Sequence, residues 1–172
     1  MKKQGFTLIE LMVVIVIMGI LAAVAVPKLF GMIAKSKASE IGPAAGEYVK
    51  LQNAYVTETN AIGNYHMVGY EMNSTTNFDY SEPTTPAGWA TGTTAIPSSS
   101  NVLTWKAKAK IALNDCEKDS EWALAVAKST GSGVTYQGQI NDGSAISSVT
   151  DGTYAADCLS LTGAFKKIAD DN

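Results

Sequence analysis

The chain has no arginine, and all 13 of its basic residues are lysine. Recognition of phosphate or carboxylate by a bidentate guanidinium fork is therefore excluded. The formal net charge at pH 7 is -3 over 172 residues, which gives no electrostatic basis for a nucleic-acid partner. The length suits one domain of ordinary size and an additional anchor.

Residues for catalysis or metal binding are equally scarce. His66 is the only histidine, and a histidine without nearby cysteines or paired carboxylates is far more often structural than a metal ligand. Asp142, Asp151 and Asp157 fall in turn-rich sequence, but their spacing is not that of a calcium-binding loop. The sequence shows no nucleophile–base pair and no phosphate-binding loop. It therefore predicts no catalytic residue, no metal site, no cofactor and no enzymatic activity.

Near the N-terminus lies a long apolar segment. From Phe6 to Val26 the only polar side chains are those of Thr7 and Glu10. A helix of this length rises about 30 Å, the hydrocarbon thickness of a bilayer. A pair of lysines precedes it, so the positive-inside rule puts the N-terminus in the cytoplasm and the rest of the chain outside.

This segment shares features with a secretory signal peptide. Small residues at positions 22, 23 and 25 offer a cleavage site, and the simplest reading is an exported protein or one with a plain anchor. Two features argue against it. The polar leader is only five residues long and ends in Gly5, and Glu10 interrupts what is otherwise a clean apolar region. A carboxylate in a membrane-length segment calls for a specific partner.

Residues 2–10 read KKQGFTLIE and are followed by an apolar run that ends at Pro27. This pattern resembles the class III leader and N-terminus of type IV pilins and pseudopilins. The resemblance implies that a prepilin peptidase of the membrane cleaves after Gly5 and that Phe6 is N-methylated. It also implies a structural subunit that starts in the inner membrane and then polymerises, with the pilus assembly machinery, into an extracellular type IV pilus. A pseudopilin of a secretion or competence system is the alternative, and a membrane-anchored binding protein is a further one.

Glu10 is the nearest counter-charge for the amine that cleavage would create at Phe6. In a helix it can face its own terminal amine, four residues away, or it can pair with the amine of a neighbouring subunit. The resemblance favours the neighbour and makes Glu10 a subunit-assembly residue. Gly19 and Pro27 weaken a helix interior, and the resemblance implies that the stretch between them can lose helicity in a filament.

Beyond Pro27, apolar residues recur at steps of three and four over residues 30–58, which predicts an amphipathic helix that continues the first. Together the two would form a rod of about 80 Å, bent at Gly42–Pro43 because a proline lacks the helical N–H. Residues 59–101 are rich in Asn, Ser, Thr, Gly and Pro, and we expect a long irregular connection with one short helix or strand.

The remainder is typical of β structure. Alternating runs predict strands at 105–111, 122–126 and 134–140, with a fourth within 153–161. The expected fold is α+β: a long N-terminal helix packed against a C-terminal antiparallel sheet. The expected divisions are a leader (1–5), a membrane and filament-core helix (6–29), an amphipathic helix (30–58) and a globular domain (59–172).

The first of these strands carries Lys106, Lys108 and Lys110 on one face. A solvated strand face is the more frequent explanation of such a pattern, and a DNA-contacting or adhesive patch is the alternative.

Cys116 and Cys158 are the only cysteines. Both lie outside the cytoplasm on the expected topology, so a disulfide is their natural state, with two free thiols as the alternative. A bridge would close a loop of about 43 residues, which corresponds to about 4 kcal/mol in the chain-entropy model. In type IV pilins a C-terminal disulfide bounds the variable surface region, and this pair resembles that arrangement.

Overall fold

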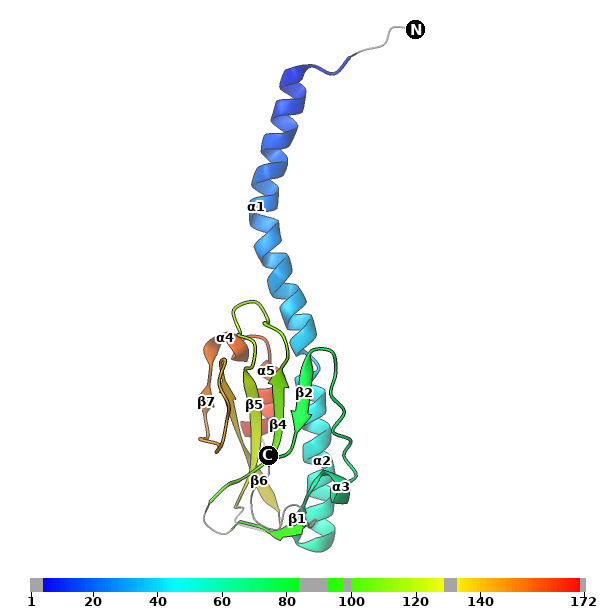
Figure 1. Cartoon of the computed structure of the whole chain (residues 1–172), viewed down its shortest axis with the longest axis vertical. Coiled ribbons are helices and arrows are strands. Elements are labelled where there is room, and N and C mark those ends of the chain that lie inside the picture. Colours follow the sequence, from blue (N-terminus) through cyan, green and yellow to red (C-terminus); the bar gives the residue numbers. More distant parts are fainter. Residues whose placement is uncertain (1–4, 84–92, 98–99, 129–132, 171–172) are drawn as a thin grey trace.

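The computed structural model describes residues 5–83, 93–97, 100–128 and 133–170 (Figure 1). A long helix, α1, projects from a domain in which helices pack on a sheet (Figure 1). The elements follow in the order α1 (Leu8–Ala38), α2 (Ile41–Thr59), β1 (Ala61–Gly63), α3 (Tyr65–Val68), β2 (Phe78–Ser81), β3 (Thr93–Ala95), β4 (Val102–Ala109), β5 (Glu121–Lys128), β6 (Val134–Asn141), β7 (Thr153–Tyr154), α4 (Ala156–Leu159) and α5 (Gly163–Asp170). The expected α+β fold is confirmed.

The long helical rod breaks between α1 and α2, slightly before the expected bend. Ser39 and Glu40 separate the two helices, yet both keep right-handed helical dihedral angles. Pro43 then falls in the first turn of α2, where a helix tolerates a residue without an N–H. The Ala44 N–H already reaches the Glu40 carbonyl at 3.2 Å. The break between α1 and α2, at Ser39 and Glu40, therefore lies about one helical turn before Pro43. Pro27 lies inside α1, which is helical on both sides of it.

Within the described residues, the main sheet has five strands in the order β2-β4-β5-β6-β7. Strands β2, β4, β5 and β6 pair antiparallel, and the two-residue β7 pairs parallel to β6. The inner face carries the larger side chains, with Trp105, Trp122 and Leu124 fully buried against α2 and α5. Because side chains alternate along a strand, Ala123 and Ala125 of β5 point to the outer face.

That outer face is also covered. Ile146 and Val149, in the segment between β6 and β7, form a second small core with Leu103, Ala123 and Ala125. The small alanine side chains let this segment lie close to the sheet. As a result β5 is buried on both faces, which the alternation of its sequence did not indicate.

Two sequence expectations for the globular domain were wrong in part. The strand expected within 153–161 is limited to β7, because the chain turns into α4 and brings Cys158 to Cys116. The described part of residues 59–101, which leaves out 84–92 and 98–99, contains more regular structure than expected: β1, α3, β2 and β3 all lie there, and β2 forms an edge of the main sheet. Sequence analysis also missed α5, whose Phe165 fills the space between α2 and β6.

Lys106 and Lys108 of β4, and Lys110 directly after it, each face a carboxylate. Their Nζ atoms lie 2.7 Å from Glu121 for Lys106, 2.9 Å from Asp119 for Lys108 and 3.4 Å from Asp79 for Lys110. The alternating strand face is therefore a row of ion pairs. This arrangement leaves no uncompensated basic patch for a nucleic acid at β4.

Candidate assembly site at the start of helix α1

Helix α1 carries an apolar surface that its own domain leaves uncovered. It is long and apolar enough to cross a membrane by length and composition, and its most apolar window is not buried in the structure. The exposed large side chains continue to Ile33, and burial begins only at Ala34. Exposed apolar area of this extent indicates contact with a membrane or with other proteins.

At the start of α1, Thr7 and Glu10 form a capping box. Thr7 is the N-cap, and its Oγ1 accepts a hydrogen bond from the Glu10 backbone N–H at 3.4 Å. In return, Glu10 Oε2 accepts from the Thr7 N–H at 2.8 Å and from the Thr7 hydroxyl at 2.6 Å. The box satisfies two donors that a helix start would otherwise leave open. The carboxylate is therefore bound to its own chain before any assembly.

Sequence analysis missed this role, although the signal was present. The motif Ser/Thr-x-x-Glu/Gln before an apolar run is typical of a helix N-terminus, and Thr7 to Glu10 matches it. The box also corrects the expected helix start. The helix begins at Leu8 rather than at Phe6, because Thr7 has the extended backbone of an N-cap.

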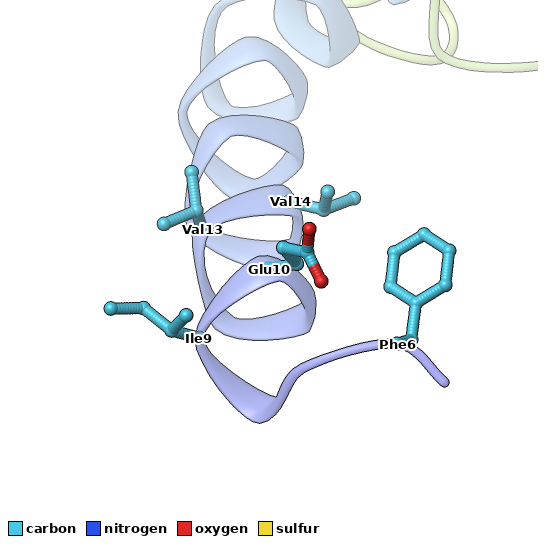
Figure 2. A pocket seen from close by; sticks show the side chains of 5 residues that line it. All are labelled: Phe6, Ile9, Glu10, Val13 and Val14. Atoms are coloured by element: carbon cyan, nitrogen blue, oxygen red, sulfur yellow. The ribbon is translucent and has the colours of Figure 1, made fainter. Parts of the chain in front are cut away.

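Phe6 consequently lies outside the helix. The geometry that would place residue 6 directly over residue 10 requires both to be helical, and this condition is not met. Figure 2 shows the Glu10 carboxylate on the side of α1 towards the Phe6 ring, with Ile9 and Val13 on the other side. Together with Val14 these residues line a shallow apolar groove around the carboxylate. Gly5 precedes Phe6 outside the helix as well.

One oxygen of Glu10 stays available. In the part of the chain that the structure describes, Oε2 accepts both hydrogen bonds from Thr7, and no bond reaches Oε1. A carboxylate has about four acceptor positions, so two bonds do not saturate it. The arrangement orients a charged group at the end of an exposed apolar helix and leaves room for a cationic partner.

Far from this site, Cys116 and Cys158 form the disulfide that sequence analysis favoured, with Cα atoms 4.8 Å apart. Asp142 lies beside it. Its Oδ1 accepts from the Glu117 N–H at 2.7 Å and from the Ser120 hydroxyl at 2.9 Å. These bonds tie the connection between β4 and β5 to the end of β6.

The structure does not bring the suggested calcium residues together. Among the described residues, the one group of three potential metal ligands is Cys116, Asp142 and Cys158, and its sulfurs are already bonded to each other. Asp151 and Asp157 lie outside that group. His66 lies in α3, where its ring lies against that of Tyr65 at an interplanar angle of 34°, with the centroids 3.8 Å apart.

Comparison with known proteins agrees with the N-terminal pattern. The model of the prokaryotic N-terminal methylation motif matches residues 1–26. The type IV major fimbrial protein FimA of Dichelobacter nodosus is 33% identical over 94 residues, 55% of this chain and 60% of FimA. The type IV major pilin protein PilA of Myxococcus xanthus is 38% identical over 64 residues, 37% of this chain and 29% of PilA.

The matches also include secretion proteins. The type II secretion system core protein G of Escherichia coli is 45% identical over 65 residues, which cover 38% of this chain and 41% of that protein. The chain thus spans 60% or less of the length of these three relatives. The leader motif and the exposed apolar helix fit anchoring in a membrane.

Proposed function

We propose that the chain is a type IV pilin, a structural subunit that polymerises into an extracellular type IV pilus; the match to the N-terminal methylation motif and the similarity to FimA and to core protein G support this proposal. The observation that carries this proposal is α1. Its apolar surface remains exposed from Leu8 to Ile33 beside a folded domain. The bilayer covers this surface first, and the α1 helices of other copies cover it in a filament.

Processing prepares the subunit for this transfer. In this scheme a prepilin peptidase cleaves after Gly5 and releases residues 1–5 as a leader, and Phe6 then carries a methylated amine. Residues 6–29 form the membrane and filament-core segment, which is helical from Leu8, and residues 30–58 continue it onto the globular domain of residues 59–172. Gly19 to Pro27 is the stretch that loses helicity when the subunit enters the filament.

Glu10 is the assembly residue in this scheme. Its Oε2 is held by Thr7, and its free Oε1 receives the Phe6 amine of a neighbouring subunit. A buried ion pair contributes little net stability, but removing one partner is strongly destabilising. A subunit in the wrong register leaves both charges unpaired among apolar helices, so the pair sets the register.

A pseudopilin is the second candidate, since core protein G of Escherichia coli is among the similar proteins. The disulfide between Cys116 and Cys158 favours the pilus, because the resemblance to pilins includes such a bridge and major pseudopilins usually lack it. Electron microscopy and N-terminal sequencing of filaments sheared from cells test the choice. A pilus subunit is expected to dominate long surface filaments and to begin at Phe6. Their absence from cells that express the processed chain would reject the pilus.

Three variants separate the charge of Glu10 from its capping role. Glu10→Gln keeps a capping-box side chain but removes the charge, so we expect filaments to be lost while membrane insertion persists. Thr7→Ala removes the side-chain cap but leaves the carboxylate, and we expect filaments to persist at lower yield. Glu10→Ala removes both the charge and the side-chain half of the capping box. Filaments of normal yield from Glu10→Gln would contradict the assembly role.

A further inference from the structure

Helix α1 carries a basic stripe that has no ion-pair partner among the described residues of its own domain, although Lys35 lines a pocket with residues 160–164. Lys28, Met32 and Lys35 follow one another at steps of four and three, so they share one face of the helix. All three are exposed. Neither lysine makes an ion pair or hydrogen bond with any residue within the described ranges. The domain packs instead on Ala34 and Ala38, which are buried.

An acidic surface lies at the disulfide end of the same chain. Asp115 and Glu117 flank Cys116, and Asp157 precedes Cys158, so the disulfide holds these three carboxylates in one region. All three are exposed, and none forms an ion pair with a residue that the structure describes. Asp115 accepts one bond, from the Asn114 side-chain amide at 2.6 Å. Lys118, which follows Glu117, and Lys37, which lines a groove with Asn114, offset only part of the negative charge.

The acidic surface and the basic stripe lie at the same level of the molecule. A groove is lined by Phe30 and Ile33 of α1 and by Leu113 and Asn114 of the connection between β4 and β5. Figure 1 shows this connection and α4 at the end of the domain from which α1 emerges. Two copies aligned side by side, with α1 helices parallel, would therefore bring the disulfide end of one copy close to the stripe of the other.

We infer that the stripe of Lys28, Met32 and Lys35 docks the disulfide end of a second copy of this chain, through Asp115, Glu117 and Asp157. The inference rests on the proposed filament. Charge complementarity selects the occupant. An anionic membrane surface would attract the stripe but repel the acidic end at the same level, whereas a second copy satisfies both. Between exposed groups such attraction is screened over about 10 Å at 0.1 M salt, so the contact orients subunits and is sensitive to salt.

Cross-linking of the intact filament tests the contact directly. A carbodiimide joins a lysine to a carboxylate only where the two groups touch. Filaments assembled while cells pass from light to heavy nitrogen contain both kinds of subunit, so a mixed light–heavy peptide pair identifies a link between chains. We expect mixed pairs that join Lys28 or Lys35 to the peptides with the three acids. The exposed Lys108–Asp119 pair, at 2.9 Å within one chain, is the internal control.

If the control link forms and no mixed pair joins either lysine of the stripe to these acids, the inference is overturned while the proposed filament function stands, even if links form within one chain. If the unmodified, processed chain forms no filaments at all, the proposed function itself fails. Cross-linking needs no substitution, so misfolding of a variant cannot obscure the result.

Charge reversal provides the second test. We expect Lys28→Glu with Lys35→Glu to lower the yield of sheared filaments, and Asp115→Lys, Glu117→Lys and Asp157→Lys to lower it as well. The combined variant should recover filaments, since its charges are complementary again. Lys50→Glu, at an exposed lysine of α2, is the matched control and should leave the yield unchanged. Loss in the lysine variant without recovery in the combined one would point to another partner, such as anionic headgroups, and overturn the inference.

Discussion

Replacing Glu121 with alanine tests how the outer face of the sheet is held together. The Glu121 side chain is 5% exposed, and its Oε2 lies 2.7 Å from Lys106 Nζ. The same oxygen accepts a hydrogen bond from the Ile146 N–H at 2.7 Å, and Lys106 donates to the Ile146 carbonyl at 3.2 Å. One carboxylate thus joins β4, β5 and the covering segment between β6 and β7.

The expected loss is large because the substitution leaves the Lys106 ammonium, whose side chain is only 18% exposed, and the buried Ile146 N–H without their acceptor. Removing one partner of a buried ion pair costs about 3–5 kcal/mol. The Ile146 N–H also loses its bond, and an unsatisfied buried donor costs about 1–3 kcal/mol. The two costs overlap, because release of the covering segment lets water reach both groups. We therefore expect Glu121→Ala to lower the free energy of unfolding by about 3–5 kcal/mol.

Denaturant unfolding of the full chain in detergent measures this loss. Trp105 and Trp122 are fully buried in the globular domain, so their fluorescence reports on its unfolding. Asp119→Ala is the matched control, because Asp119 pairs with Lys108 at 2.9 Å but both side chains are more than 40% exposed. The control should shift the transition far less, since exposed ion pairs contribute little.

A double variant separates the ion pair from the hydrogen bond to the covering segment. Lys106→Met with Glu121→Leu removes both charges, and replacing a buried pair with apolar residues is often neutral. The Ile146 N–H still lacks an acceptor, so a loss of about 1–3 kcal/mol should remain. Equal effects of Glu121→Ala and Asp119→Ala would refute the reasoning, because burial would then make no difference.

Three further changes probe the domain. Replacing Cys116 and Cys158 with serine should cost up to about 4 kcal/mol, because the unfolded chain regains the freedom of a long loop, and the same unfolding assay measures it. Gly138→Ala should cost about 1–3 kcal/mol by overpacking, since its Cβ would lie 2.5 Å from that of Ala169; a wild-type midpoint would contradict this. The hydrogen bond from Lys108 lowers the pKa of the Asp119 carboxyl group. The stabilising effect of this ion pair is present at neutral pH and should disappear as the pH falls through the lowered pKa. NMR titration should show that pKa return towards its ordinary value when the lysine is replaced with alanine.

Local patterns predicted the helices and central strands because their signals lie within a few residues. The steps of three and four after Pro27 indicated an amphipathic helix, and α2 buries that stripe. Alternating runs placed β4 and β6 within a few residues of their observed bounds. These signals depend on the local chain geometry, so they can be read without knowledge of the partner element.

The missed elements depend on partners distant in sequence. Strand β2 has only four residues and is defined by its pairing with β4, which no short window reveals. Helix α5 has eight residues. Such a short helix is marginal alone and is stabilised by packing, here of Phe165 against the inner face of the sheet. The covering segment between β6 and β7 likewise depends on Glu121, whose burial the sequence did not indicate.

At the assembly site, the sequence indicated the charge of Glu10 but not what holds it. The reason is that the side chain has two roles with different spacing rules. A charge near the membrane boundary tolerates a shift of one residue along the helix. A capping box does not, because it requires the third helical position after the N-cap. With Thr7 as the N-cap, that position is Glu10. A carboxylate at position 9 or 11 would keep the charge and lose the bonds to Thr7, so the helix start fixes the position of the charge.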